Sequence, residues 1–317
     1  MESKSKILKF ICAAGNEDIE EIEKLSYVFA SVGFNMIDIV VNPNGGKGAS
    51  LAAFAKVKAY LDFNDMDYSI NETKGPGDAV TIVQKLCSAG SRKIAVIGGD
   101  GTFHEALNGM DFTTSRLGFI PAGRGNDFAS ALGIPSDPVE ALKTIHAGEE
   151  LDLDYMQVGK HRCLNICGTG LDVEVLRLAE KSKGKFTYTA ALVKCLLNYK
   201  PYQIEVTVNG KTKEYSCITV AVCNGSQFGG GIKICPNASP RDGLLDLVIV
   251  TKPKQSVFLV MPGFIKGKHI GKGYTIVEQC EEVTIKSPQV IQLDGEIYEE
   301  NVLAAKIVKG GLKTFKF

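Results

Sequence analysis

The chain has 317 residues, of which 44% are hydrophobic and 23% charged, so it is long enough for two domains with packed cores. Lysine and arginine together number 36, as do aspartate and glutamate, and this balance gives no support for nucleic-acid binding, which needs a basic stripe. Nine cysteines, none in a CxxC pair, argue against a zinc site and indicate buried, reduced thiols.

Residues 1–35 are predicted to be a partly helical N-terminal extension, with apolar residues at Ile19, Ile22, Leu25 and Val28. The segment begins with basic residues and a short apolar run, but it becomes acidic where a signal peptide has its small-residue cleavage site. No apolar stretch reaches the roughly 18–20 residues that span a bilayer. We therefore expect a cytoplasmic protein without a transmembrane segment, whose contact with the inner membrane face is peripheral.

Residues 36–150 alternate apolar runs with helical segments. The expected strands are Met36–Val41, Tyr68–Asn71, Lys93–Ile97 and Leu117–Ile120. The expected helices are Leu51–Leu61 with Ser50 as its cap, one from Asp78 through Leu86, and one that begins near Thr102. Strands that alternate with helices at this spacing predict an α/β domain with a doubly wound parallel sheet and right-handed crossovers.

Residues 151–300 have a different pattern, in which short strands are joined by turns. Asn209-Gly210 is a hairpin signal between two of these strands. Helices are expected near Leu171–Glu180, Thr189–Leu197 and Gln255–Ile265. The second domain is therefore predicted to be mostly antiparallel, as a β-sandwich or a flattened barrel.

The strongest local signal is the segment Gly98-Gly99-Asp100-Gly101-Thr102, which follows one predicted strand and precedes a helix. Glycines allow a sharp turn and a close approach of backbone to ligand, and the helix start directs N–H groups and a positive dipole end toward it. Such a place favours phosphate. Asp100 fits beside phosphate only if a divalent metal or a hydroxyl donor lies between them. The alternative is a glycine turn with a helix cap.

Two further glycine loops follow predicted strands at the same edge of the sheet. The first, Asn42-Pro43-Asn44-Gly45-Gly46-Lys47-Gly48, lacks the spacing of the GxxxxGK[ST] nucleotide loop. The second, Pro121-Ala122-Gly123-Arg124-Gly125-Asn126-Asp127, offers a guanidinium at Arg124 and helix caps at Asn126 or Asp127. Open α/β sheets bind ligands at this edge, so three such loops predict a nucleotide site.

In this order, the segments VVNPNGGKG, GGDGTFHEALNG, IPAGRGNDFASALGIP, SPRDGLLDLVIV and QLDGE resemble the diacylglycerol kinase catalytic family, bacterial lipid kinases included. The resemblance covers about residues 36 to 317. The GGDGT segment alone is shared with NAD kinases and phosphofructokinase relatives, whereas its combination with the third loop and the late DGE segment is more discriminating. The resemblance implies ATP bound between a nucleotide domain (36–150) and a β-rich lipid-substrate domain (151–300), with residues 301–317 returning to complete the first.

The resemblance also implies which residues surround the nucleotide. They are Asn42, Pro43, Asn44, Gly45, Gly46, Thr73, Gly98, Gly99, Asp100, Gly101 and Thr102, with Arg124 and Asn126 from the third loop. The family commonly has threonine where this chain has Arg124. Arginine there could make a stronger, charge-assisted contact with phosphate, or it could point away.

Phosphoryl transfer to an alcohol requires that the acceptor hydroxyl lose a proton. The resemblance implies that Glu296, in the segment Asp294-Gly295-Glu296, is the proton acceptor, and that Asp294 supports it or binds metal. Together with Asp100 these are the expected catalytic carboxylates. The alternative is a tight turn between strands, for which Asp-Gly is a common sequence.

A magnesium site is implied at Ser239, Asp242 and Leu244, the last through its backbone carbonyl. Magnesium prefers such oxygen ligands and retains waters. The alternative is a polar turn before a strand.

Two further features of the sequence could contribute to the site. His104 lies one turn into the helix after GGDGT and could face the site, but a capping or packing role is favoured. Lys266, Lys268, His269 and Lys272 follow an apolar helix, and could either lie on an anionic membrane or form a solvated helix end.

These patterns favour an ATP- and Mg²⁺-dependent lipid kinase that converts diacylglycerol to phosphatidic acid. A kinase of the same superfamily acting on NAD or a sugar phosphate is the alternative, against which the long β domain with RDGLLD and DGE argues. A non-catalytic nucleotide or lipid sensor would not need Asp100, Asp294 and Glu296 together. The lipid itself, and whether the chain forms a homodimer, are left open.

Overall fold

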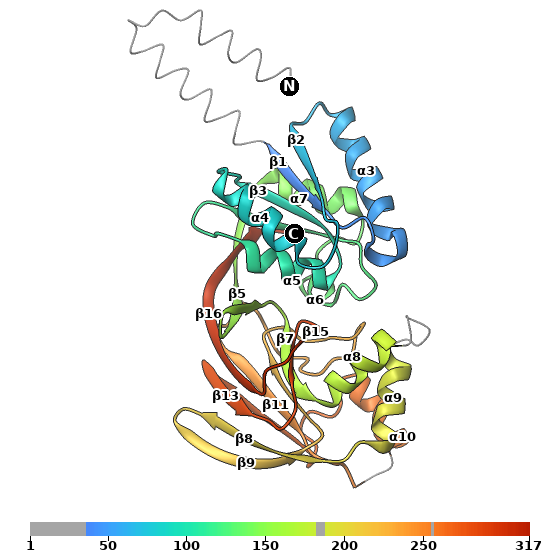
Figure 1. Cartoon of the computed structure of the whole chain (residues 1–317), viewed down its shortest axis with the longest axis vertical. Helices are drawn as coiled ribbons and strands as arrows, with labels where there is room; N and C mark the ends of the chain where they lie inside the picture. The colour runs from blue at the N-terminus through green and yellow to red at the C-terminus, as the bar shows by residue number, and fades with distance from the viewer. Residues whose placement is uncertain (1–35, 182–187, 255–256) are drawn as a thin grey trace, which may run out of the picture.

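The computed structural model describes residues 36–181, 188–254 and 257–317. The predicted extension over residues 1–35 lies outside the described residues. The described chain forms two domains, one with helices around a parallel sheet and one built mainly of antiparallel strands (Figure 1). The predicted fold class, a doubly wound α/β domain followed by a β-sandwich, is confirmed.

The sheet of the N-terminal domain is parallel and has the strand order β2-β1-β3-β4. Its strands are β1 (Ile37–Val41), β2 (Tyr68–Glu72), β3 (Lys93–Gly98) and β4 (Arg116–Pro121). The β1 sequence IDIVV is buried at every position, because a central strand of such a sheet is covered on both faces. β2 lies at the edge and is only partly buried.

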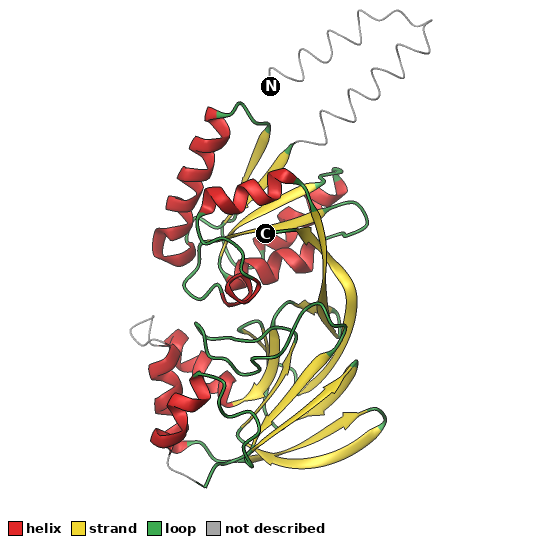
Figure 2. Ribbon diagram, turned by 180° about the vertical axis from the view of Figure 1, so that it is seen from behind, coloured by secondary structure: helices red, strands yellow, loops and turns green. Residues whose placement is uncertain are grey.

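Helices cover both faces of this sheet (Figure 2). They are α3 (Ala49–Phe63), α4 (Asp78–Ser88), α5 (Asp100–Gly109), α6 (Asp127–Leu132) and α7 (Pro138–Ala147), and a short 3₁₀ turn η1 (Gly45–Gly48) precedes them. Residues of α4 and α5 share a buried cluster with Val40 and Val96, whereas α3 and α7 pack with Ile39 and Ile97. Adjacent residues of each central strand thus point to opposite cores.

Three predicted caps are wrong, because each side chain has another hydrogen-bond partner. Ser50 does not cap α3, which begins at Ala49, and its buried hydroxyl instead donates to the carbonyl of Ala122 at 3.4 Å. Asn126 stands at the start of α6 without capping it, and Asp127 bonds to the other domain. The side chains of Ser50 and Asp127 bond to partners far away in the sequence, whereas Asn126 bonds to Gly123 within its own loop.

The C-terminal domain contains two six-stranded antiparallel sheets, with the orders β12-β11-β10-β7-β14-β15 and β6-β5-β16-β13-β8-β9. The strands are β5 (Glu150–Val158), β6 (His161–Cys163), β7 (Ile166–Gly170), β8 (Tyr202–Val208), β9 (Lys211–Cys217), β10 (Thr219–Cys223), β11 (Leu245–Val250), β12 (Thr275–Cys280), β13 (Glu282–Lys286), β14 (Ile291–Leu293), β15 (Glu296–Tyr298) and β16 (Val302–Phe315). The predicted hairpin at Asn209-Gly210 joins β8 to β9, with positive φ at both residues.

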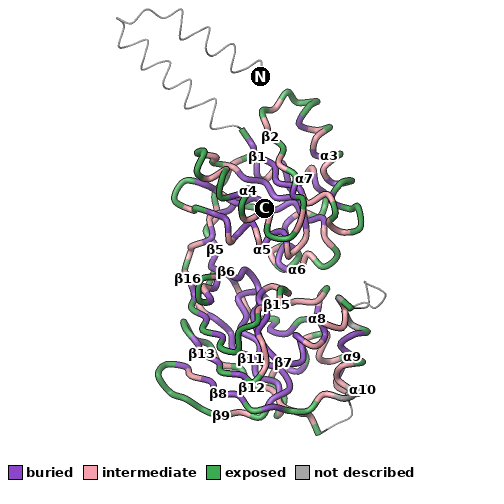
Figure 3. The backbone as a smooth tube through the Cα atoms, in the orientation of Figure 1, coloured by how far each residue is buried: buried purple, intermediate pink, exposed green. Residues whose placement is uncertain are grey.

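The two sheets pack face to face around one buried cluster, which includes Val206 and Ile285 from one sheet and Val222 and Leu247 from the other. The outer face of the sheet that contains β10 and β11 is covered by α8 (Leu171–Lys181), α9 (Tyr188–Asn198) and α10 (Val257–Ile265). Its central strands are consequently buried along their whole length (Figure 3). Within the described residues, no helix is both long enough and apolar enough to cross a bilayer.

The last strand, β16, runs from the C-terminal domain to the N-terminal one (Figure 1). It pairs with β5, and the register shifts between Val308 and Leu312. Beyond this irregularity Thr314 donates to the carbonyl of Leu117 at 2.6 Å, and Phe315 is buried with residues of α3 and α7. We propose that this strand completes the N-terminal domain.

Replacing Phe315 with alanine should lower the free energy of unfolding by about 3–5 kcal/mol, because a large buried ring is lost from this core. Urea unfolding measured by circular dichroism checks the change. Lys316→Ala, at an exposed neighbouring position, is the control, and it should stay within about 0.5 kcal/mol of the parent. Equal and small effects of both substitutions would count against a terminal strand that belongs to this core.

Candidate active site

Three loops converge at the carboxyl edge of the parallel sheet. Asn42, after β1, donates through Nδ2 to Oγ1 of Thr102, after β3, at 3.2 Å. A side-chain carbon added at Gly99 would lie only 2.9 Å from the Cα of Gly123 in the third loop. One added at Gly46, where φ is +60°, would lie 2.4 Å from the carbonyl oxygen of Ala122. Glycine is therefore required for these loops to pack together.

The remaining predicted nucleotide residues lie in or beside these loops. Pro43, Asn44 and Gly45 follow Asn42, and Thr73 is buried after β2, where its N–H donates to the carbonyl of Val41 at 2.9 Å. Asn126 uses its side chain within the third loop, since Oδ1 accepts from the N–H of Gly123 at 2.8 Å. Arg124 is exposed. The structure thus brings the predicted set together, with Asn126 engaged in shaping its own loop.

α5 begins at Asp100, directly after Gly98 and Gly99. At this end of the helix, the N–H of Phe103 donates to the carbonyl of Gly99, four residues earlier. The N–H groups that precede it have no partner within the helix. They give the start of α5, at Asp100, Gly101 and Thr102, the character of an anion-binding site.

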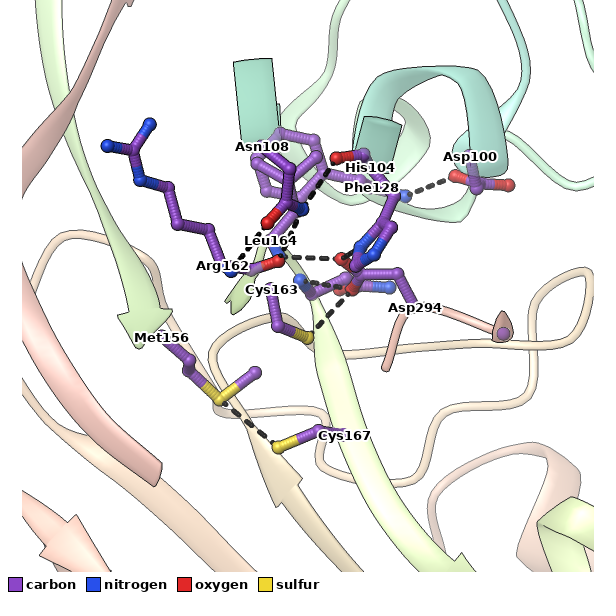
Figure 4. Close-up of polar contacts among 12 residues, drawn as sticks. Asp100, His104, Asn108, Phe128, Met156, Arg162, Cys163, Leu164, Cys167 and Asp294 are labelled. Atoms are coloured by element: carbon purple, nitrogen blue, oxygen red, sulfur yellow. Dashed lines mark hydrogen bonds and ion pairs between the residues drawn. The ribbon is translucent and has the colours of Figure 1, made fainter. Parts of the chain in front are cut away.

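Asp100 lies in the loop after β3, next to the loop after β4. Its Oδ1 accepts from the N–H of Phe128 at 3.4 Å, so it supplies the cap of α6 from another part of the chain (Figure 4). Burial, followed by the charge of Asp127, raises the pKa of Asp100 to about 6. A bound cation would relieve this unfavourable ionisation.

Asp127 holds the two domains together. Its buried carboxylate accepts from the N–H groups of Gly230 and Gly231 at 2.8 Å each, and from Nε2 of Gln227 at 3.2 Å. All three donors belong to the C-terminal domain. No pattern in the sequence predicts this contact, which joins residues 103 positions apart.

Asp294 and Gly295 form the two-residue turn between β14 and β15, with φ of 51° and 94°. The turn and the candidate site were alternatives in the sequence, and the structure contains a turn whose aspartate is deeply buried. The Asp294 side chain, 3% exposed, accepts from the N–H groups of Leu164, Asn165 and Ile166 and from the Cys163 thiol. Asp294 is therefore a buried anion in a shell of donors.

His104 of α5 is the remaining donor to Asp294 (Figure 4). Its Nδ1 lies 2.8 Å from Oδ2 of Asp294, and its Nε2 lies 2.9 Å from the hydroxyl of Tyr298. His104 thus does not cap a helix, and its buried ring packs within a polar network at the site. The available signal was its position four residues after Asp100, which places both on one face of the helix.

The charges of this cluster support one another. Burial alone would lower the pKa of His104, but the hydrogen bond to Asp294 and the charges of Asp294, Glu296 and Glu105 raise it above its ordinary value. Burial would likewise raise the pKa of Asp294, but His104 and the backbone N–H groups hold it below its ordinary value. Asp294 therefore remains ionised beside an imidazole that binds protons more tightly than usual.

Glu296 is exposed and lies against the start of α5. Its Oε1 is 2.9 Å from the position that a side-chain carbon on Gly101 would take. The predicted proton acceptor therefore adjoins the predicted phosphate-binding turn, although 195 positions separate them in the numbering from Gly101 to Glu296.

The predicted magnesium residues lie in a different loop, before β11. Asp242 is exposed and accepts from the N–H of Leu244 at 3.0 Å, and Ser239 is half-buried. Near them one buried oxygen of Asp246 has no hydrogen-bond partner in the described structure, and burial, then the charge of Asp242, raises the pKa of Asp246. These oxygen groups are of the type that magnesium prefers, but the described residues hold no cluster of three or more His, Cys, Asp or Glu side chains for a metal.

Two family models match almost the whole described chain. Residues 37–158 match the diacylglycerol kinase catalytic domain, and residues 165–316 match the YegS C-terminal NAD kinase beta sandwich-like domain. A diacylglycerol kinase of Bacillus subtilis (strain 168) is 30% identical over 268 residues, which are 81% of this chain and 88% of that protein. The chain belongs to the diacylglycerol kinase family. It is thus a member of a family of lipid kinases.

Other members of the diacylglycerol kinase family support the same assignment. A diacylglycerol kinase of Mycobacterium tuberculosis (strain CDC 1551 / Oshkosh) is 28% identical over 272 residues, covering 82% of this chain and 88% of that protein. A crystal structure of a candidate diacylglycerol kinase from Bacillus anthracis str. Sterne has a TM-score of 0.76 at 25% identity, and the match covers 89% of this chain and 95% of that one.

Asp100→Asn should stabilise the nucleotide-free protein at neutral pH. A carboxyl whose pKa is raised from 3.8 to about 6 disfavours folding when ionised, and this cost is absent below the lower value and complete above the higher one. The gain in unfolding free energy should therefore reach up to about 3 kcal/mol at pH 7.5 and vanish toward pH 4. Urea unfolding at both pH values measures it.

Asp67→Asn, at an exposed position of the same domain, is the matched control and should leave the free energy of unfolding unchanged at both pH values. A pH-independent effect of Asp100→Asn would show that the ionisation of Asp100 is not the source of the strain.

Proposed function

We propose that the chain transfers the γ-phosphoryl group of ATP to a lipid hydroxyl, with diacylglycerol as the acceptor and phosphatidic acid as the product. One observation carries the proposal, namely the contact between Glu296 and the helix start at Gly101. It places a carboxylate that can accept a proton beside N–H groups that can bind phosphate. The relatives named diacylglycerol kinase supply the choice of lipid.

In this proposal the loops after β1, β3 and β4 bind the nucleotide, and Arg124 reaches its phosphates from the exposed rim. Asp100 holds Mg²⁺, which when bound neutralises charge on the phosphates. Glu296 accepts the proton of the lipid hydroxyl through a carboxylate oxygen as that hydroxyl attacks the γ-phosphorus, the bond from the γ-phosphorus to the bridging oxygen breaks, and ADP leaves. The ionised Asp294 anchors the turn that carries Glu296, and all its polar contacts are with donors.

A second magnesium ion is proposed at Ser239, Asp242 and the carbonyl of Leu244. The loop packs against β5 and β16, since Gly243 donates to Asp154 at 2.8 Å and lies beside Lys309. The unpartnered oxygen of Asp246 supports a cation nearby. In this proposal the second magnesium ion holds the loop and takes no part in the reaction.

The deciding experiment follows phosphate from radiolabelled ATP with magnesium into diacylglycerol, a monoacylglycerol, a sphingoid base or a polyprenol in mixed micelles. Glu296→Gln should lower kcat by about 10²–10⁴-fold and leave ATP binding unchanged, because only the proton acceptor is removed. Glu299→Gln, at a side chain 80% exposed three positions away, is the control and should keep full activity.

Label in NAD or a sugar phosphate in place of lipid would move the chain to another kinase activity of the superfamily. Tight ATP binding without transfer to any acceptor would identify a sensor. Full activity of Glu296→Gln would refute the proposed proton acceptor.

We also propose that a basic face around α10 contacts the anionic inner membrane surface. Between Asp246 and Glu278 the sequence contains no acidic residue, although the chain as a whole is neutral. This stretch contains Lys252, Lys254, Lys266, Lys268 and Lys272. Leu259 of α10 is 78% exposed, which gives the basic face an apolar residue that can enter the membrane interface.

Replacing Lys266 and Lys268 together with glutamine should weaken binding to vesicles rich in phosphatidylglycerol about 30-fold, since each lysine near an anionic surface contributes about 1 kcal/mol. Vesicle flotation at two salt concentrations measures it. The control is the pair Lys211→Gln and Lys213→Gln on the exposed edge strand β9, which should bind as the parent does. Equal losses in both pairs would mean a diffuse charge effect with no defined membrane face.

A further inference from the structure

α5 meets the β14–β15 hairpin at two places on one face. Gly101 adjoins Glu296, and His104, three residues later, contacts Asp294 at 2.8 Å and Tyr298 at 2.9 Å. Residues three apart on a helix lie one above the other on the same side. The helix that begins at the phosphate-binding turn therefore also carries the ring that contacts the catalytic hairpin.

The two partners of His104 flank Glu296 symmetrically in the sequence. Asp294 is two residues before it and Tyr298 two residues after it, and Glu296 and Tyr298 lie on the same side of the short strand β15. One imidazole thus holds both ends of the segment that presents Glu296. Glu296 itself is exposed, and it lies in the middle of this segment.

The network allows a consistent pattern of donors and acceptors. Asp294, an ionised acceptor, takes the Nδ1 proton, which leaves Nε2 to accept from the hydroxyl of Tyr298 when the ring is neutral. The Tyr298 ring packs on His161, with centroids 4.5 Å apart, and Asp294 is fixed by backbone N–H groups of the β6–β7 segment. Both residues that contact His104 are therefore held in place by contacts of their own.

We propose that His104 is a positioning residue that fixes Glu296 over the start of α5 by bridging Asp294 and Tyr298. The inference rests on the proposed role of Glu296 as proton acceptor. His104 touches neither substrate nor nucleotide in this account, and its whole effect passes through the hairpin. It also couples the domains, because α5 belongs to the N-terminal domain and the hairpin to the C-terminal one.

Three substitutions separate the two contacts. Asparagine places its amide near the position of Nδ1 and can still donate to Asp294, glutamine reaches toward the position of Nε2 and Tyr298, and leucine keeps neither bond. His104→Leu should lower kcat about 10²-fold, because a displacement near 1 Å at a reacting group has that effect. The Kd for ATP should stay within about threefold of the parent value. His104→Asn, His104→Gln and Tyr298→Phe should each lose less than His104→Leu.

His146→Leu, at an exposed position on α7, is the matched control and should leave kcat and the Kd for ATP unchanged. Circular dichroism and Tm of every variant test folding. If His104→Leu does not fold, His104→Asn and Tyr298→Phe provide the test, since both keep the Asp294 bond and lose the Tyr298 bond. Similar partial losses of kcat in these two variants support the proposal, and a parent-like kcat in both overturns it.

A double-mutant cycle tests whether His104 acts through Glu296. In the Glu296→Gln background, His104→Leu should lower the residual rate by less than about threefold, since no placed carboxylate remains to be lost. Losses that multiply would overturn the proposal, as would a parent-like kcat for His104→Leu or a loss confined to ATP binding. Full activity of Glu296→Gln alone would refute the proposed proton acceptor, an outcome distinct from multiplying losses.

Discussion

The arrangement of the site depends on one buried charge, the carboxylate of Asp294. An ionised carboxylate removed from water is tolerated only when hydrogen-bond donors replace the lost hydration. Here the donors are three consecutive backbone N–H groups at residues 164–166, the Cys163 thiol and the His104 ring. They come from two domains and from segments far apart in the sequence. Satisfying the charge therefore requires that the hairpin, the β6–β7 segment and α5 be assembled together.

A second buried carboxylate, at the start of α6, is satisfied in a similar way. Asp127 of α6 is satisfied by Gly230, Gly231 and Gln227 of the C-terminal domain, while the α6 start is capped by Asp100 of the preceding loop. The donors to Asp127 thus all come from the other domain, whereas Asp294 takes one bond across the interface, from His104, and the others from its own domain. Such bonds hold an interface in one geometry, because any sliding would leave a buried carboxylate without donors.

The sequence predicted what local patterns determine. Alternating apolar runs and glycine turns predicted the parallel sheet and the loops at its edge, since strand burial and positive φ impose their own residue types. The antiparallel domain followed from short strands and hairpin signals such as Asn209-Gly210, and its sandwich form is confirmed.

What the sequence did not predict depends on distant partners. Ser50 and Asp127 have the residue types of helix caps, but each bonds to a carbonyl or N–H group that only the tertiary fold brings near. His104 is a similar case, because its partner Asp294 is 190 residues away and nothing in the pattern around His104 indicates it. Polar side chains can satisfy several local roles equally well, so only the folded chain selects one.

The electrostatics of the site follow from these choices. Four carboxyl groups lie near the start of α5, those of Asp100, Asp127, Asp294 and Glu296. Two of them, Asp127 and Asp294, already accept hydrogen bonds from several donors. Asp100 is satisfied only in part, as its raised pKa indicates, and Glu296 faces solvent. The incomplete compensation therefore lies at Asp100, where triphosphate would add further negative charge. A divalent cation between Asp100 and the phosphates would neutralise the negative charge of both groups. This need for charge balance, more than any preformed set of ligands, is the structural argument for magnesium.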